Sequence, residues 1–479
     1  RNMALAKIQE LQELPTVPLD FKDWEDAWRT HISDLTGIGS DVPYSTSIQR
    51  FRHLIQSGLL RHTDITDHPE RFIAAHRVLA ELATSLGPGF WIRFTVHFNL
   101  FAGTVVALGS PDQVARLADI QKKGQVGCFG LTEVLAGVNS GLVVNTTAHW
   151  DPAQQMFCIH SPDAGSHKNW ISQGLVADMC VVVADLHVGR RSFGPHAFLM
   201  ELRRNGQLVE GVEVGDMGVK TIGNDLDNAW ISFNKVWVPK SALLNKYGDV
   251  DGDKYIQRQK GVRNMDMIGQ RLYTGRCVIA RSALVFTRQL YKSTREYTDS
   301  KRCWAPKGAE LTLSEIPQLA ELWSEADGEL SRMERFMEKI ETELAGCLAK
   351  MRIPPPALVE AIAAAKVKAV ETGISLCWKL KQEVGSYALM HGCGFEQLDY
   401  LQCCKFAEGD SRILMQKITR DRVKAFQKGF KGPEAEARCC EAILALDGKK
   451  DPFAMHKRVY ELAEAVISRT IDEFGPTAK

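Results

Sequence analysis

The chain has 479 residues, of which 24 % are charged, and a formal net charge of +1. A chain of this length usually forms two or three domains of roughly 100–200 residues each and can bury a large core. Acidic and basic residues are mixed along it, so the sequence shows no electrostatic footprint for nucleic acid or for an anionic membrane surface. These features favour a small molecule as the ligand.

No membrane span is expected, because the apolar runs fall short of the roughly 18 uninterrupted apolar residues that a span requires. The chain begins at Arg1 and shows no apolar signal core, which fits a mature form without its targeting segment or a trimmed chain. Its last residues, Thr-Ala-Lys, do not match the peroxisomal Ser-Lys-Leu pattern.

Twelve cysteines are present, but none forms a C-x-x-C pair and none has a histidine at zinc spacing. We therefore predict no metal site. Buried thiols in a reducing compartment are the favoured interpretation, and oxidation sensing by the adjacent pair Cys403 and Cys404 is the alternative.

Helical periodicity dominates the first region, residues 1–126. The stretch DHPERFIAAHRVLAELATSL has its apolar side chains near the 3.6-residue period, and PDQVARLADIQKKG follows as a capped amphipathic helix. We predict an N-terminal all-α domain over these residues.

Short β-branched or alternating runs replace this pattern in residues 127–250. Examples are MFCIHS, DMCVVVADLH and AWISFNKVWVP, which turn clusters such as RRNGQ and GNDLDN separate. This texture predicts a middle domain that is a β-barrel or β-sandwich.

The helical period returns in residues 251–479, in the stretches 268–298, 315–348 and 355–390, each of which is long enough for a bundle helix. Consecutive prolines in RIPPPA separate two of them, because proline cannot continue a helix. The complete prediction is an α+β chain with an all-α domain, a β domain and a C-terminal four-helix bundle.

Three motifs carry residues suited to chemistry. GCFGLTEVLAGVNSG has glycines that let a backbone approach a ligand and a hydroxyl at Thr132. KNWISQG places Ser172 two positions after Trp170, so that an indole can cover a planar ring while a hydroxyl meets its edge. Alone, the first reads as a turn and the second as a strand with a buried tryptophan.

The third motif, EGDSRILMQKI, begins with Glu408. Among Phe406, Ala407 and the apolar face of Ile413 and Leu414, a carboxylate would be partly desolvated, which raises its pKa toward the range of a general base. The alternative is an ordinary acid in the first turn of a helix, where it favours the macrodipole.

In this order, CFGLTEVLAG, KNWISQG and EGDSRILMQKI resemble the acyl-CoA dehydrogenase and acyl-CoA oxidase superfamily of flavoproteins. The segment from Gly211 to Val250 is similar to the oxidase middle domain almost throughout, and the resemblance covers roughly Arg71 to Arg422. It implies FAD as the cofactor, an acyl-CoA substrate and a homodimer or homotetramer.

The resemblance also implies roles for single residues. Glu408 matches the base that removes the α-proton of an acyl thioester, with Gly409 beside the substrate and Arg276 near the thioester. The residues matched to FAD contacts are Thr132, Trp170 and Ser172, and, through a neighbouring subunit, Lys301 or Arg302 with Trp304. Val138, Ala388 and His391 depart from the family pattern.

The resemblance leaves the electron acceptor open. The missing C-terminal domain of long oxidases favours a dehydrogenase of the fatty-acid β-oxidation type, which passes electrons to an electron-transfer flavoprotein and resides in the mitochondrial matrix. The oxidase-like middle domain favours an oxidase that uses O₂, and a peroxisome or plastid is the alternative compartment. A third hypothesis is a structural or assembly subunit without turnover.

Overall fold

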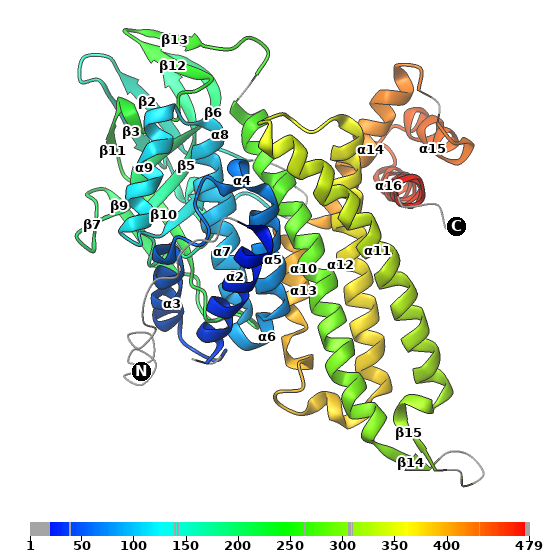
Figure 1. The fold of residues 1–479 in the computed structure, drawn as a ribbon. Coiled ribbons are helices and arrows are strands. Elements are labelled where there is room, and N and C mark those ends of the chain that lie inside the picture. Colours follow the sequence, from blue (N-terminus) through cyan, green and yellow to red (C-terminus); the bar gives the residue numbers. More distant parts are fainter. Residues whose placement is uncertain are drawn as a thin grey trace. The chain divides into compact units, whose positions relative to one another are not determined.

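The computed structural model describes residues 20–37, 40–137, 140, 143–262, 264–304, 308, 310–430 and 432–474, without the side chains of 264–267 and 270. The chain divides into two compact units, Arg1–Gly275 with Gly346–Ile353, and Arg276–Ala345 with Pro354–Lys479. The predicted α+β fold is confirmed, with N-terminal helices, a central β half-barrel and C-terminal helices (Figure 1). The bounds of the three predicted domains stay predictions.

The first unit begins with helices that bury their aromatic and aliphatic side chains. In chain order they are α2 (Phe21–Thr36), α3 (Tyr44–Ser57), α4 (Asp64–Asp67), α5 (Pro69–Glu81), α6 (Ala83–Leu86), α7 (Pro88–Thr95), the π-helix η1 (Val96–Ala102), α8 (Gly103–Leu108) and α9 (Pro111–Lys122). The predicted cap of α9 is present, because Ser110 and Gln113 form a capping box around Pro111.

One helical stretch, Pro88–Leu108, is long and apolar enough to cross a bilayer. Within the structure 89 % of its most apolar window is buried. This burial is what a core helix shows, and the same stretch supplies Phe90, Phe94 and Phe98 to the interior.

A pair of buried histidines joins these helices to the first strand, β1 (Gly127–Gly130). His97 Nδ1 accepts from the Gly127 amide, so its Nε2 must donate to His62 Nε2, 2.7 Å away. His62 Nδ1 in turn faces the Leu117 carbonyl. Burial lowers the pKa of His62 to about 4, so the pair is neutral at pH 7.

A six-stranded mixed sheet forms most of the β region. Its strands are β1, β2 (Thr147–Asp151), β3 (Met156–His160), β5 (Met179–Val188), β6 (Arg191–Glu201) and β11 (Val236–Pro239). The long strand β5 pairs with β1 through its first half and with β2 through its second, while β6 follows its other edge. This sharing of one edge curves the sheet.

A second, three-stranded sheet has the order β4-β10-β9. It consists of β4 (Lys168–Ser172), β9 (Val212–Asp216) and β10 (Asn228–Phe233). Short hairpins are β7 (Arg203–Arg204) with β8 (Gln207–Leu208), and β12 (Gly248–Asp251) with β13 (Lys254–Gln257). Short 3-10 turns are η2 (Ala164–Ser166) and η3 (Lys240–Ala242).

Long helices form the bundle. They are α10 (Asn264–Ser300), α11 (Pro317–Ala349) and α12 (Pro356–Glu383), followed by α13 (Asp399–Phe406) and α14 (Ser411–Gln427). The sequence stretch assigned to the third long helix runs to Met390, but α12 ends at Glu383 because Gly385 turns left-handed at φ +64°. The turns η6 (Gly385–Leu389) and η7 (Phe395–Gln397) follow it.

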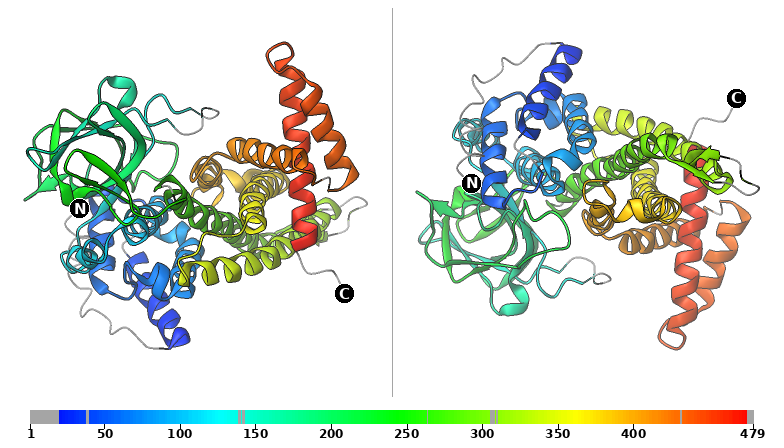
Figure 2. Two further views of the ribbon diagram at one scale, coloured as in Figure 1. Left: turned by 90° about the horizontal axis from the view of Figure 1, so that it is seen from above. Right: turned by 90° about the horizontal axis from the view of Figure 1, so that it is seen from below.

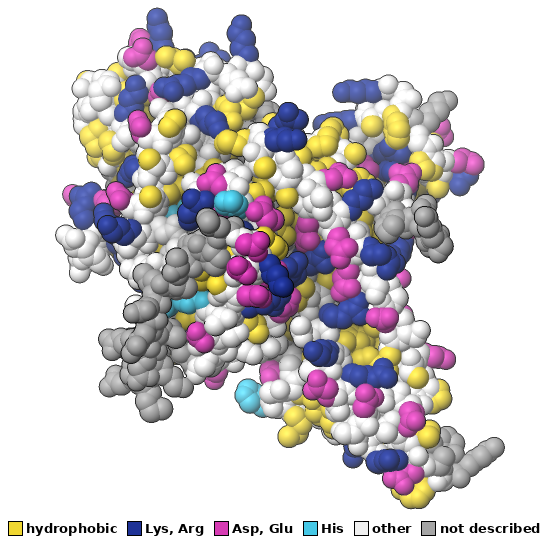
Figure 3. All heavy atoms as spheres, viewed as in Figure 1, with side chains coloured by type: hydrophobic (Ala, Val, Ile, Leu, Met, Phe, Trp, Pro, Cys, Tyr) yellow, Lys and Arg dark blue, Asp and Glu magenta, His cyan; other side chains and the backbone are white. Residues whose placement is uncertain are grey.

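After α14 the chain continues as α15 (Glu434–Ala445) and α16 (Pro452–Phe474), which lie side by side in both views of Figure 2. Between α10 and α11 stand β14 (Arg302–Trp304), β15 (Glu310–Thr312) and the 3-10 turn η5 (Leu313–Glu315). On the face in Figure 3 acidic and basic side chains are interspersed, as the even charge balance of the sequence predicts.

Candidate functional site

In the first unit Trp170 stands out of β4 because the strand carries a bulge. Ala229 pairs with Ile171 and Ile231 with Lys168, so two residues of β4 lie opposite the single residue Trp230. Trp170 adopts φ +55°, and its amide donates to Met217 Sδ at 3.2 Å. The bulge re-aims its side chain, which is 57 % exposed although it is a large aromatic.

Two hydroxyl residues lie on β4 and on the loop that is hydrogen-bonded to it. Ser172 is half-buried at the end of β4, where its Oγ accepts from Asn228 Nδ2 at 3.3 Å. Thr132 is exposed, and its carbonyl accepts from the amide of Asn169, the residue before Trp170, at 2.8 Å. The structure therefore brings the three residues predicted for the flavin ring onto one strand and the loop bonded to it.

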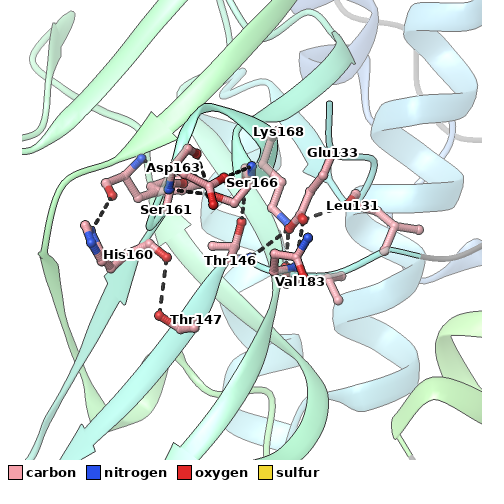
Figure 4. Close-up of polar contacts among 12 residues, drawn as sticks. Leu131, Glu133, Thr146, Thr147, His160, Ser161, Asp163, Ser166, Lys168 and Val183 are labelled. Carbon is pink, nitrogen blue, oxygen red and sulfur yellow. Dashed lines mark hydrogen bonds and ion pairs between the residues drawn. The ribbon is translucent and has the colours of Figure 1, made fainter. Parts of the chain in front are cut away.

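A fully buried ion pair holds that loop in place (Figure 4). Lys168 Nζ donates to Glu133 Oε1 at 2.7 Å and to the Val183 carbonyl oxygen, also at 2.7 Å. The Glu133 carboxylate also accepts from the amides of Asn145 and Thr146, at 2.7 and 2.9 Å. Because the Lys168 ammonium and both Glu133 carboxylate oxygens have hydrogen-bond partners, the two charges tolerate burial.

The ion pair connects the two motifs. Glu133 follows Thr132 directly, and Lys168 lies two residues before Trp170 in β4. Burial lowers the pKa of Lys168, and the attraction of Glu133 opposes this shift. Removing either partner would leave the other charge buried and uncompensated, so the pair locks the Thr132 loop to the Trp170 strand.

In the second unit Glu408 lies in the turn between α13 and α14. The residue adopts φ +58°, and Gly409 follows with φ +95°. Asp410 is the N-cap of α14, which begins at Ser411. Glu408 therefore stands outside the first turn of that helix, and the alternative of an acid that stabilises a helix N-terminus is wrong.

The carboxylate of Glu408 is enclosed although the residue as a whole is half-buried. Its Oε2 is buried and has no hydrogen-bond partner in the described part of the chain. Burial raises the pKa of Glu408 to about 8, against the attraction of the nearby cations Arg276 and Lys366. Leu414 is buried as predicted, whereas Phe406 and Ala407 are exposed.

Arg276 and Gly409 lie next to Glu408. Arg276 Nε donates to the Glu408 carbonyl oxygen at 2.9 Å. A Cβ on Gly409 would lie 3.3 Å from Arg276 Nη2, and the positive φ of Gly409 also disfavours a side chain. The structure thus brings Arg276 next to Glu408 and Gly409, although the hydrogen bond between Arg276 and Glu408 joins residues 132 positions apart in the sequence.

Lys301, Arg302 and Trp304 are not part of this group. They follow the C-terminal end of α10, and the 24 helical steps from Arg276 to Ser300 extend about 36 Å at 1.5 Å per residue. Arg302 and Trp304 lie in the short β14–β15 hairpin, where Trp304 is 78 % exposed. Their role at a neighbouring subunit stays a prediction.

Of the departures from the family pattern, Val138 lies outside the described residues. Ala388 is buried in η6, and His391 is exposed. Next to them the Glu396 carboxylate accepts from the amides of Gly392 and Gly394, at 2.8 and 2.9 Å. This carboxylate organises the altered loop. Over the described ranges the structure contains no group of acids, cysteines and histidines that could hold a metal.

Sequence reasoning missed Lys366, whose side chain is buried next to the Glu408 turn. A signal was available, because a lysine interrupts the alanine-rich run AIAAAKVKAV, where a buried helix face is expected. Sequence reasoning also missed the β-bulge at Trp170, because no residue type in KNWISQG predicts it.

Comparison with known proteins adds to this geometry. No protein-family model matches the chain. Human peroxisomal acyl-coenzyme A oxidase 3 is 32 % identical over 277 residues, which are 56 % of this chain and 38 % of that protein. Acyl-coenzyme A oxidase 2, peroxisomal, of Arabidopsis thaliana is 27 % identical over 79 % of this chain and 56 % of its own length. The chain therefore spans about half the length of these relatives.

The acyl-CoA oxidase 1 structure from Yarrowia lipolytica superposes with a TM-score of 0.72 at 18 % identity, over 98 % of this chain and 80 % of that one. The chain is thus similar in sequence to acyl-CoA oxidases and has the fold shared by acyl-CoA oxidases and acyl-CoA dehydrogenases.

Both branches of the superfamily share the fold. Acyl-CoA oxidase-2 of Caenorhabditis elegans, solved with FAD, ascaroside-CoA and ATP, matches with a TM-score of 0.72 at 19 % identity, over 98 % of this chain and 80 % of that one. Butyryl-CoA dehydrogenase from Megasphaera elsdenii matches with a TM-score of 0.63 at 17 % identity, over 84 % of this chain and 99 % of that one.

Proposed function

We propose that this chain is an FAD-dependent acyl-CoA oxidase, in which Glu408 removes the α-proton of an acyl-CoA thioester and O₂ is the final electron acceptor. The substrate would leave as the α,β-unsaturated thioester. One observation carries the proposal: a carboxylate at the position of the family base is enclosed, has an unpartnered oxygen and stands on a left-handed backbone.

The chemistry of Glu408 fits a base. With a pKa of about 8, its carboxylate is a stronger base than an ordinary glutamate and still ionises near neutral pH. The buried Oε2 has no protein donor among the described residues, so no hydrogen bond would have to be broken before it accepts a proton. The strained backbone around it is typical of functional sites, where packing holds an unfavourable conformation.

The first unit fits a flavin. An exposed indole offers a face on which a planar ring can stack, and hydroxyls at Thr132 and Ser172 offer hydrogen bonds. The Glu133–Lys168 pair holds the two segments that carry them. When bound, FAD would supply a two-electron acceptor for the hydride from the β-carbon, with O₂ as the final oxidant and hydrogen peroxide as its product. Trp170, Thr132 and Ser172 would orient the ring, and Glu408 would hold the α-proton.

Two findings favour an oxidase over the dehydrogenase that the sequence alone favoured. The curated relatives described above are named acyl-CoA oxidases. The acyl-CoA oxidase 1 structure also aligns with 98 % of this chain. The butyryl-CoA dehydrogenase structure aligns with only 84 % of it, although 99 % of the dehydrogenase is then covered. An electron-transfer flavoprotein is then not required, and peroxisomal relatives give the mitochondrial preference no support.

We also propose a homodimer or a larger homo-oligomer. The hairpin with Arg302 and Trp304 exposes a large aromatic side chain at the end of α10. A second copy of the chain would cover this indole, and Lys301 or Arg302 would then supply a positive charge to the neighbour's FAD. Closed symmetric assemblies are the usual form of such self-association.

The test uses the purified chain with FAD added. A yellow protein is reduced without oxygen by a series of acyl-CoAs of different chain length, and air is then admitted. We expect loss of the oxidised flavin band, followed by fast reoxidation with one hydrogen peroxide per flavin. Glu408→Gln should keep the flavin and slow its reduction by roughly 10²–10⁴-fold or more.

Each part of the proposal has its own contrary result. Reduction by acyl-CoA with slow reoxidation and little peroxide would favour a dehydrogenase. A fully loaded flavin that no acyl-CoA reduces would favour the structural or assembly subunit. A colourless protein that takes up no FAD would overturn the cofactor assignment.

A further inference from the structure

A buried lysine from α12 reaches the turn that carries Glu408. Lys366 is completely buried, and its Nζ lies 2.5 Å from the Lys405 carbonyl oxygen, 2.9 Å from the Gly409 carbonyl oxygen and 3.4 Å from Ser411 Oγ. An ammonium group has three donors and no acceptor, so these oxygens satisfy it. They come from the end of α13, the turn and the start of α14, on both sides of Glu408.

Two cations hold successive carbonyl groups of this turn. Arg276 donates to the Glu408 carbonyl, and Lys366 donates to the next one, at Gly409. Both residues of the turn have a positive φ, which for glutamate is unfavourable and persists only when the surroundings enforce it. These two hydrogen bonds help to enforce it, because each fixes the orientation of one peptide plane.

We propose that Lys366 is a positioning residue, which holds the Glu408–Gly409 turn through its hydrogen bonds and tunes the basicity of Glu408 through its charge. This inference rests on the proposed function, in which Glu408 is the base. The role of Lys366 is indirect, since its Nζ bonds the turn and not the Glu408 carboxylate.

The electrostatics of the site support this role. The positive charges of Arg276 and Lys366 favour the Glu408 carboxylate and hold its pKa below what burial alone would produce. Burial lowers the pKa of Lys366 itself to about 7. The attraction between the two groups is reciprocal, so ionisation of Glu408 raises the pKa of Lys366 again and favours its charged form. The other groups that face Lys366 are Cys404 of α13, Asp410 of the turn and Glu371 of α12, which raise its pKa, and Arg276 of α10, which lowers it. Glu371 is itself paired with Lys405 at 2.7 Å.

The decisive variant is Lys366→Met, which keeps a long unbranched side chain without its charge and its donors. Without that charge the Glu408 carboxylate is less favoured. We expect the pH midpoint of anaerobic flavin reduction to rise by about one unit, and the limiting rate to fall roughly 10–100-fold because the base is less well positioned. Lys368→Met, two residues along α12, is the matched control and should leave both quantities unchanged.

A second measurement needs no turnover. The unfolding midpoint is recorded against pH for the parent and for Lys366→Met, each with and without Glu408→Gln. The difference in unfolding midpoint between each protein and its Glu408→Gln variant, followed against pH, reports the ionisation of Glu408. The pH at which this difference changes should rise when Lys366 is replaced. If no acyl-CoA reduces the flavin but this shift is seen, the proposed function fails and the positioning role stands.

Two results would overturn the inference. One is a folded Lys366→Met protein in which neither pH midpoint moves. The other is loss of folding in both Lys366→Met and Lys366→Gln, which retains amide donors without a charge, because the lysine would then be required for the structure alone.

Discussion

At the scale of single residues, two of the positions proposed for chemistry depart from relaxed backbone geometry. Trp170 and Glu408 both have a positive φ, which costs about 1–3 kcal/mol for a residue other than glycine. In addition Trp170 exposes its indole, and Glu408 buries a carboxylate oxygen without a partner. Each feature opposes folding, so a functional reason for retaining it is expected.

The buried carboxylate of Glu408 predicts a pH-dependent cost in stability. Its pKa is about 8 in the folded chain against 4.5 as the unperturbed value, so the folded state binds the proton more tightly. The resulting stabilisation is complete below pH 4.5 and is lost as the pH rises through 8. Glu408→Gln should therefore be more stable than the parent at pH 9, by about 1–3 kcal/mol, and nearly equal at pH 5.

Urea unfolding followed by circular dichroism at pH 5, 7 and 9 measures this difference. Asp410→Asn changes the neighbouring N-cap and serves as a comparison for a carboxyl in the same turn. A gain from Glu408→Gln that is the same at all three pH values would show that the pKa of Glu408 is not raised.

The exposed indole of Trp170 predicts a loss of cofactor without a loss of folding. If it stacks on the flavin ring, Trp170→Ala should weaken FAD binding by roughly tenfold, since stacking contacts contribute about 1 kcal/mol or more. Trp237→Ala is the matched control, because Trp237 is also exposed on a strand of the same unit. Titration of the cofactor-free protein with FAD compares them. Equal affinities would exclude Trp170 from the site.

At the scale of secondary structure elements, buried ion pairs attach α15 and α16 to the bundle. Glu436 of α15 is almost completely buried and pairs with Arg422 of α14 and Arg469 of α16. Arg469 also reaches Glu360 of α12 at 2.7 Å. One carboxylate thus joins three helices, and the network makes the last helices an integral part of their unit.

Glu436→Ala should destabilise the second unit by about 3–5 kcal/mol, because it leaves the buried Arg422 guanidinium without its acid and removes one of the carboxylates that pair with Arg469. Glu434→Ala is the control from the same helix. Its carboxylate is exposed and pairs only with Arg438 among the interactions of the described residues, so its removal should change stability by less than 1 kcal/mol. Amide exchange in α15 and α16 locates the effect, and equal losses for both variants would contradict the network.

At the scale of the whole molecule, self-association is the property that the chain's surface predicts. Tyr297 at the end of α10 stacks on Tyr387 of η6 with 3.7 Å between ring centroids, which brings the β14–β15 hairpin and η6 to the same end of the bundle. Trp304 and Leu389 at this end are largely exposed. Such apolar exposure is typical of an interaction surface.

We expect sedimentation of the FAD-loaded protein to give a dimer or a larger assembly. Trp304→Ser combined with Leu389→Ser should shift it toward the monomer and lower its FAD content, because a neighbour would no longer contribute to the cofactor site. The matched control is Phe453→Ser on α16, another exposed aromatic position. A fully loaded monomer from the parent chain would contradict this prediction.

Much of this architecture follows from the sequence by itself. The 3.6-residue period and the proline and N-cap signals predict α9, α10 and α11, and β-branched runs predict β3 and β5. These signals are local, since they reflect how each segment must expose one face and bury another. The ordered motifs predicted the superfamily and named Glu408 and Trp170. They did not predict the β14–β15 hairpin, whose three-residue strands are too short to show a period.

Only the tertiary structure decided what these residues experience. The pKa of Glu408 depends on enclosure by a turn with the backbone at φ +58°, and the Lys366 ammonium reaches that turn across 43 residues of sequence. The exposure of Trp170 depends on a bulge against β10. Desolvation and register arise from atoms that are distant along the chain, so no local pattern contains them, and they determine whether a carboxylate is a surface charge or a base.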